Sequence, residues 1–254
     1  MVTRKSRQEI EKMARAGRVV AEVLALVESE LKPGVSTAHL DRVAERFIRK
    51  QNAIPSFKGY HAAMGKGGFP ASLCISIDNE VVHGIPGDRE IRAGQVVSVD
   101  AGAILDGWHG DAARTFIVGE APQQVRDLVD HTRLAMMAGI AAAIPGNRIG
   151  DIGAAIEDVA RPLGYGIVRQ FVGHGIGTAM HEEPQVPNYR TGGRGMELKA
   201  GICLAIEPML TLGAADVMTA PDGWTVVTRD GSLAAHFEHS IAVTDHGPQI
   251  LTTL

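Results

Sequence analysis

The first fifty residues place apolar side chains with the period of two amphipathic helices. Ser6 and Glu9 form a capping-box signature, and apolar residues then recur at helical spacing from Ile10 to Leu31, where Lys32-Pro33-Gly34 ends the pattern. A second predicted helix after this turn carries one apolar face: Leu40, Val43, Ala44, Phe47 and Ile48. We therefore predict that a helix pair opens the chain.

The same order of elements returns 112 residues later, where Pro145-Gly146 repeats Pro33-Gly34. The preceding segment, Val125 to Ile144, predicts a helix, and the following one repeats the second apolar face: Ile152, Ala155, Ile156, Val159 and Ala160. His83-Gly84-Ile85-Pro86 is echoed by His174-Gly175-Ile176-Gly177. We interpret this order as a duplication, with halves of about 6–120 and 121–254 within one catalytic domain over residues 1–254.

Each half also contains an apolar β-type run that ends in an acid. IRAGQVVSVD ends at Asp100, and LKAGICLAIE ends at Glu207, each after an Ala-Gly turn. Each half then returns through a hairpin to a strand that begins with an acid, DAARTFIV at Asp111 and EHSIAV at Glu238. Coincidence is the alternative, because such turns are common before helices and strands. The pattern favours an α+β fold in which two helix-helix-strand halves face each other across a central antiparallel sheet.

The composition indicates the cellular location and excludes some classes of partner, but it identifies no ligand. The 254 residues are 45% hydrophobic and 21% charged, with a net charge of -4, which gives no reason to expect nucleic acid or an anionic membrane as partner. The start, MVTRKSRQEIEK, lacks a signal-peptide core, and the longest apolar run, AMMAGIAAAI, is about half a membrane span. With only two cysteines, a reducing cytoplasm is the predicted location.

The four acids predict a metal centre. Four buried carboxylates at short range cannot all stay ionised without a multivalent cation. Two divalent ions would balance their charge, and His174 would add a nitrogen ligand, a donor set that suits Mn, Fe(II), Co or Zn. Carboxylates that bridge two ions roughly 3.5–4 Å apart support hydrolysis. The histidines outside the repeated pattern are interpreted as solvated or structural: His39, His61, His109, His131, His236, His239 and His246.

Four segments resemble the type I methionine aminopeptidases, which have the pita-bread fold: VDAGAILDGWHGDAARTF, GHGIGTAMHEEP, AIEPM and FEHSIAVT. The resemblance implies that Asp100 chelates one metal, that His174 and Glu207 bind the other, and that Asp111 and Glu238 bridge them. It also implies that Glu207 handles the proton of the attacking water. The histidines His83 and His181 would hydrogen-bond the scissile amide and the tetrahedral oxyanion.

The resemblance further implies an apolar pocket for a methionine side chain, lined by Phe57, Tyr60, Phe69, Cys74, Met180 and Trp224. The glycines Gly173, Gly175 and Gly177 are predicted to turn the backbone tightly beside the metal. The segment HAAMGKGG, from His61 to Gly68, is longer than in the bacterial relatives, and Met180 replaces a frequent aromatic residue.

The function implied is removal of the initiator methionine from nascent chains whose second residue is small, by a monomer near the ribosome. One alternative is an X-Pro aminopeptidase or prolidase of the same fold, which usually carries an extra N-terminal domain, whereas the first helix here begins near residue 6. Type II enzymes carry a helical insertion that the compact run from His181 to Glu238 lacks. A third alternative is a metal-free binding module, which the presence of all five ligands disfavours.

Overall fold

A computed structural model describes residues 2–61 and 67–254, so most of the HAAMGKGG segment lies outside the described residues. The predicted opening helix pair is confirmed: α1 spans Arg7–Glu30 and α2 spans Thr37–Lys50. At the start of α1, the Glu9 amide donates to Ser6 Oγ over 3.4 Å, and the Ser6 amide donates to Glu9 Oε2 over 2.7 Å. This capping box satisfies amides that would otherwise lack partners in the first helical turn.

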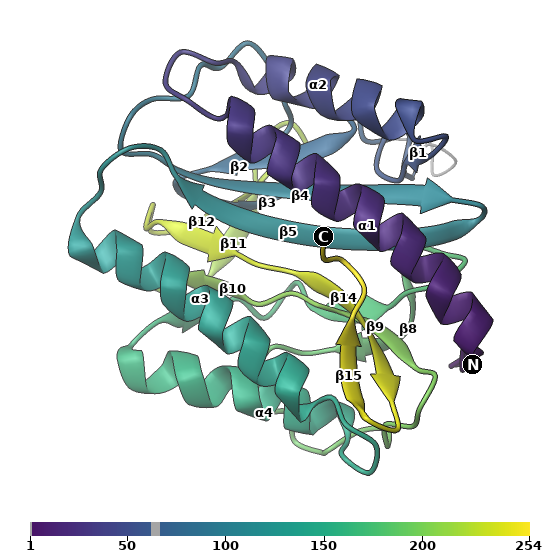
Figure 1. Ribbon diagram of the computed structural model, residues 1–254. Helices are drawn as coiled ribbons and strands as arrows, with labels where there is room; N and C mark the ends of the chain where they lie inside the picture. Colours follow the sequence, from purple (N-terminus) through teal and green to yellow (C-terminus); the bar gives the residue numbers. More distant parts are fainter. Residues whose placement is uncertain (1, 62–66) are drawn as a thin grey trace.

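The second helix pair is also confirmed, with α3 over Gln123–Ala142 and α4 over Ile149–Ala160, followed by the short 3-10 helix η2 over Arg161–Leu163. The two pairs lie at opposite ends of the view in Figure 1, with the strands between them. Each pair covers its own apolar core, the first built around Leu24, Leu40 and Ile48, the second around Leu128, Ile152 and Ile156. No helix of the described chain is long and apolar enough to cross a membrane.

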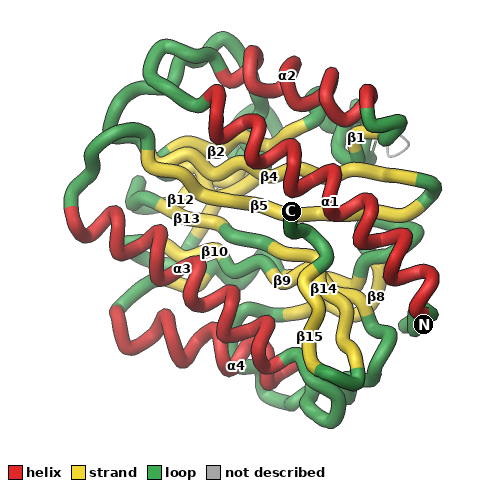
Figure 2. Tube along the Cα trace, viewed as in Figure 1, coloured by secondary structure: helices red, strands yellow, loops and turns green. Residues whose placement is uncertain are grey.

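The strands form two larger and two smaller sheets, shown in yellow in Figure 2. The first large sheet contains β1 (Ile54–Pro55), β2 (Leu73–Ile77), β4 (Val96–Leu105) and β5 (Trp108–Ile117). The second contains β7 (Gly173–Gly175), β8 (Glu182–Val186), β9 (Cys203–Ile206), β14 (His239–Thr244) and β15 (Gly247–Ile250). The small sheets combine β6 (Gly166–Ile167), β10 (Met209–Thr211) and β13 (Ala234–His236), and β3 (Glu80–Val82), β11 (Val217–Thr219) and β12 (Val226–Thr228). The pairing of the large sheets is antiparallel, as predicted.

The two large sheets meet where β5 passes the start of β14. The Glu238 amide donates to the Ala113 carbonyl over 2.9 Å, and Ser240 Oγ donates to the Asp111 carbonyl over 2.8 Å. The Asp111 amide in turn donates to Ser240 Oγ over 3.0 Å. These contacts bring two residues 127 positions apart in the sequence, Asp111 and Glu238, to one point between the sheets.

Two of the acids lie at different strand positions from those predicted. Asp100 was expected at the end of its strand but lies in the middle of β4, and Asp111 lies inside β5 instead of at its start. The reason is the small residues that follow Asp100, which continue the ladder so that Ala101 pairs with Ala112 and Gly102 with Asp111. The other two predictions hold, since Glu207 directly follows β9 and Glu238 directly precedes β14.

Candidate metal centre

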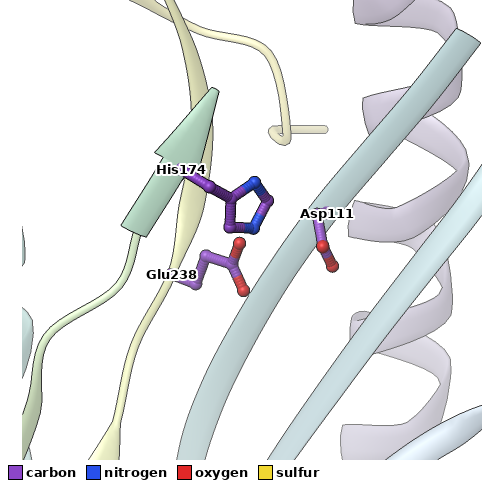
Figure 3. A group of neighbouring side chains, drawn as sticks. All are labelled: Asp111, His174 and Glu238. Atoms are coloured by element: carbon purple, nitrogen blue, oxygen red, sulfur yellow. The ribbon is translucent and has the colours of Figure 1, made fainter. Parts of the chain in front are cut away.

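Three of the predicted ligands converge on one point. Asp111 from β5, His174 from β7 and Glu238 from the start of β14 each offer a ligand atom, and these atoms lie within 4.8 Å of one another. In Figure 3 the His174 ring and the Glu238 carboxylate lie together on one side of β5, with Asp111 opposite them. All three residues are buried. An imidazole between two buried carboxylates is a ligand set for a divalent metal ion.

The remaining two predicted ligands complete the same site. Glu207 Oε1 lies 3.5 Å from His174 Nε2, and Asp100 shares the cavity wall with Asp111. All five side chains line one cavity of about 440 Å³. The structure therefore brings together the whole predicted ligand set, four carboxylates and one imidazole.

The electrostatics of this cluster fit a bound cation. Among the described residues, Asp100 Oδ1, Asp111 Oδ1 and Glu238 Oε1 are buried without a hydrogen-bond partner. Burial raises the pKa of Asp100 to about 7, and burial followed by the charges of neighbouring carboxylates raises the pKa of Asp111, Glu207 and Glu238 well above their ordinary values. Buried carboxylates of like charge are costly unless a cation compensates them.

His174 is held in the form that binds metal. Its Nδ1 donates to the Gly175 carbonyl over 2.8 Å, which leaves the Nε2 lone pair directed away from that bond. Burial lowers the pKa of His174 to about 3, so the imidazole is neutral at physiological pH. A neutral, oriented imidazole is the state in which histidine ligates a metal ion.

The tight turn predicted for Gly173 and Gly175 is wrong, because these two glycines serve close packing, whereas Gly177 lies in the bend that follows β7. Gly173 and Gly175 lie in β7, and neither has a positive φ. A Cβ on Gly173 would lie 2.3 Å from the Ala205 carbonyl oxygen, and one on Gly175 would lie 2.2 Å from that of Glu183. Only glycine lets the neighbouring backbone approach this closely.

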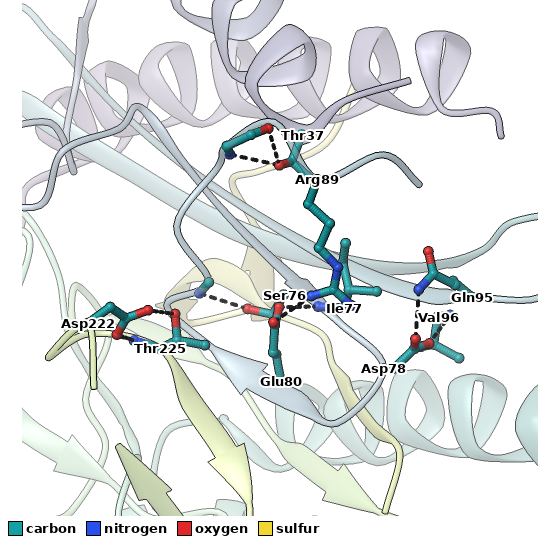
Figure 4. Close-up of polar contacts among 12 residues, drawn as sticks. Thr37, Ser76, Ile77, Asp78, Glu80, Arg89, Gln95, Val96, Asp222 and Thr225 are labelled. Atoms are coloured by element: carbon teal, nitrogen blue, oxygen red, sulfur yellow. Dashed lines mark hydrogen bonds and ion pairs between the residues drawn. The ribbon is translucent and has the colours of Figure 1, made fainter. Parts of the chain in front are cut away.

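His83 lies in a braced, left-handed backbone position. Its φ is 61°, a conformation that costs energy for a residue with a side chain and is common at functional sites. Polar contacts brace the segment around it, including Gly84 N to Ser76 Oγ at 3.0 Å and Glu80 to Arg89 at 2.6 Å (Figure 4). The His83 ring packs edge-on against Phe171, 5.5 Å between centroids, and lines the cavity.

His181 lines the same cavity and lies beside His174. Its ring centroid is 4.2 Å from that of His174, and its Nδ1 is hydrogen-bonded to the Tyr60 hydroxyl at 2.5 Å. This bond orients the ring and leaves Nε2 as the nitrogen available to a substrate. Tyr60 thus has a contact to His181 in addition to its predicted place in the pocket.

The predicted pocket residues form one apolar cluster in the same cavity. Phe57, Phe69, Cys74 and Met180 are buried in it, with Tyr60 and Trp224 packed against them. Phe69 meets Trp224 edge-on with ring centroids 5.3 Å apart. Cys74 lies opposite Asp100 in the β2–β4 register, so the apolar cluster directly adjoins the carboxylates. The cavity is therefore apolar at one end and acidic at the other.

His236 is a cavity residue that the sequence analysis missed. Only 2% of it is exposed, its Nε2 has no partner among the described residues, and that nitrogen lies 3.8 Å from Glu207 Oε2. It was assigned to the solvated or structural histidines, yet it lines the cavity. No local pattern signals this place, because His236 ends β13 and Glu238 lies between β13 and β14, so the two residues do not share a strand.

Comparison with known proteins identifies the family. A model of metallopeptidase family M24 matches residues 11–245. The chain belongs to metallopeptidase family M24. Use of a divalent metal follows from that membership and agrees with the carboxylate cluster.

Relatives within the M24 family cover the whole chain. A methionine aminopeptidase of Clostridium acetobutylicum is 52% identical over 253 residues, 99% of each chain. Methionine aminopeptidase 1 of Bacillus subtilis is 45% identical over 252 residues, again 99% of each chain. The solved methionine aminopeptidase of Thermotoga maritima superimposes with a TM-score of 0.96 at 41% identity, covering 100% of both chains.

Proteins outside this group of relatives share the fold. An Xaa-Pro dipeptidase from Bacillus anthracis superimposes with a TM-score of 0.79 at 23% identity, covering 99% of this chain and 62% of that one. At that identity the likeness shows the fold alone. The predicted pita-bread fold is confirmed.

Proposed function

We propose that this chain is a methionine aminopeptidase that removes N-terminal methionine from polypeptides with a small second residue. The observation that carries the proposal is the adjacency, within one cavity, of an apolar, aromatic cluster and four carboxylates, of which two are buried and two are half-buried. Relatives at 45–52% identity over the full length are methionine aminopeptidases, which supports the same substrate. A solved Xaa-Pro dipeptidase and a solved prolidase share the fold at only 23% and 21% identity to this chain.

The five ligands are proposed to hold two divalent ions, Mn, Co, Fe(II) or Zn. Asp100 would chelate one ion, His174 and Glu207 the other, and Asp111 and Glu238 would bridge them. Bound ions would supply Lewis-acid polarisation of the scissile carbonyl and lower the pKa of the attacking water. The unpartnered carboxylate oxygens support this assignment over a metal-free binding module.

The remaining groups act on the substrate. The aromatic cluster takes the methionine side chain, since thioether contacts with aromatic rings contribute about 0.3–1.5 kcal/mol each. Glu207 accepts a proton from the attacking water and returns it to the leaving amine. The ring nitrogens of His83 and His181 hydrogen-bond the scissile amide and the oxyanion. His181 already has its Nδ1 occupied by Tyr60, so Nε2 faces the substrate.

The cellular setting is part of the proposal. The substrates would be N-termini of nascent polypeptides, met by a cytoplasmic monomer close to the ribosome. No role for nucleic acid or a membrane as partner is proposed, in keeping with the net charge of -4.

Release of free methionine from Met-Ala-Ser tests the activity, with Met-Pro-Ser, Leu-Ala-Ser and a Gly-Pro dipeptide as comparisons. Metal-stripped protein is assayed with Mn, Co, Fe(II) or Zn added back. We expect metal-dependent cleavage of the Met peptides and little of the others. Preference for Gly-Pro would assign a prolidase activity to the same centre. The absence of cleavage with every metal would contradict the proposal that the chain is an enzyme.

Replacing His181 with alanine is expected to lower kcat by about 10²- to 10³-fold, the usual loss for one oxyanion donor. Metal content should stay unchanged, because the ring is bonded to Tyr60 and contacts no carboxylate of the centre within hydrogen-bond range. Steady-state kinetics and elemental analysis check both parts. His246→Ala, at an exposed turn residue, is the control; metal loss in His181→Ala would make His181 a ligand instead.

A further inference from the structure

A partly buried ion pair joins the N-terminal segment to Glu182, the first residue of β8, which directly follows the loop (residues 176–181) that carries His181. Lys5 Nζ lies 2.5 Å from Glu182 Oε2 and 2.8 Å from Thr3 Oγ1. The side chains of Lys5 and Glu182 are only 5% and 17% exposed. Lysine is almost never buried without a partner, so this contact is specific to the geometry of the two segments.

The ion pair also supports the loop, because Glu182 binds the loop backbone. Glu182 Oε1 accepts a hydrogen bond from the Ala179 amide over 3.3 Å, which closes the loop across Met180 and His181. Gly177 lies against the pair: a Cβ there would lie 2.6 Å from Lys5 Cε and 2.5 Å from Glu182 Oε1. The aliphatic part of the Lys5 side chain therefore fills the space beneath the loop, and a side chain at position 177 would displace it.

The backbone of the N-terminal segment is fastened independently. The Lys5 amide donates to the Gly201 carbonyl over 2.6 Å, and Arg4 Nε donates to the Ala200 carbonyl over 2.7 Å. These bonds hold the segment to the turn before β9, the strand that leads to Glu207. Removing the Lys5 ammonium group therefore leaves the segment docked and changes only the contacts of that group with Glu182 and Thr3.

We propose that Lys5 is a positioning residue, whose ion pair with Glu182 holds the loop that presents Met180 and His181 to the substrate. The inference rests on the proposed function, because it acts through the role given to His181. Tyr60 orients the His181 ring from the other side. Misplacement of a reacting group by about 1 Å can cost 10²-fold in rate.

The test uses the metal-loaded full chain with Lys5→Met, Glu182→Gln and the double variant, assayed on Met-Ala-Ser. Each single variant is expected to lower kcat by about 10- to 100-fold. Metal content should change little, since the carboxylates keep their contacts, whereas KM should rise modestly because Met180 of the apolar cluster moves with the loop. Because both changes break the same contact, the kcat of the double variant should be at most about twofold lower than that of the slower single variant.

The double variant also separates positioning from folding. Lys5→Met leaves Glu182 charged and partly buried without its cation, which lowers the melting temperature, whereas the double variant removes both charges and should recover the melting temperature while kcat remains low. In a His181→Ala background, Lys5→Met should cost no more than about twofold, since its target is gone. Arg7→Gln is the control, because its ion pair with Glu11 is 93% and 64% exposed.

The inference would be overturned by full activity in Lys5→Met, by loss of metal from that variant, or by an undiminished effect of Lys5→Met on kcat in the His181→Ala background. Recovery of kcat together with melting temperature in the double variant would also overturn it, since the pair would then serve folding alone. Inactivity of the wild-type protein on every peptide is a different outcome. It would refute the proposed function, whereas an active wild type with an active Lys5→Met refutes only the positioning role.

Discussion

Asp111→Asn is expected to abolish activity while making the metal-free protein more stable. The amide cannot bridge two ions as a carboxylate does, so the loss of rate should exceed the 10²- to 10³-fold typical of a single lost donor. The same change removes one of the four clustered carboxyls, whose pKa is raised well above the ordinary range by burial and by its neighbours, so the metal-free variant no longer has to take up a proton at this position when it folds at neutral pH. In metal-free protein that relief should raise the melting temperature by roughly 2–4 °C for each 1 kcal/mol gained.

Differential scanning calorimetry and elemental analysis of metal-free and metal-loaded samples check both parts. Asp106→Asn is the matched control, since that aspartate lies on the same hairpin but is 60% exposed beside Arg15. It should leave metal content, rate and melting temperature unchanged. Normal activity in Asp111→Asn would refute the bridging role, and a lower melting temperature of the metal-free variant would show that the carboxylates do not repel one another.

The clustering of the proposed metal ligands was predictable because the same sequence pattern occurs in both halves of the chain. Each half of the sequence leads an apolar strand to an acid, and only a shared cation makes four such acids tolerable in a core. The convergence of Asp111, His174 and Glu238 follows from that repeated pattern. The helix pairs were predictable for a similar reason, since capping residues and helical spacing are local signals, confirmed at Ser6 and across α1 to α4.

The missed features depend on contacts between distant segments. Lys5 and Glu182 are 177 positions apart, and nothing local to either residue signals their pairing. Asp100 was placed at a strand end because small residues after it resemble a turn, whereas pairing with β5 keeps them in the ladder. Gly173 and Gly175 are glycines because of the carbonyls of Ala205 and Glu183, which only the assembled sheet brings near.

The stability that bound metal adds to the protein is expected to increase as the pH rises from about 4 to 7, because the metal-free protein loses stability over this range when its carboxyls titrate in the unfolded state. A carboxyl whose folded pKa is raised stabilises the fold while it keeps its proton, and this contribution is lost as pH rises from the unfolded pKa through the folded pKa. For Asp100 that pKa is about 7, and the pKa values of Asp111, Glu207 and Glu238 are also raised. Each carboxyl that titrates contributes a slope of at most about 1.4 kcal/mol per pH unit.

Comparing samples with and without metal separates these carboxyls from the buried histidines. Burial lowers the pKa of His174 and His236 to about 3, so both are neutral in the folded state of either sample, and their effect on stability below the ordinary histidine pKa of 6.5 cancels in the difference. Melting temperatures at several pH values, with and without metal, check the difference. Titration calorimetry in buffers of different ionisation enthalpy should also show protons released on metal binding.

A difference in melting temperature that stays flat or falls from pH 4 to 7 would mean that the pKa values of the four carboxyls are not raised in the metal-free protein. Without metal, Asp111→Asn should lose less stability than the wild type over this range, because it removes one titrating group and weakens the repulsion that helps to raise the pKa of Glu238.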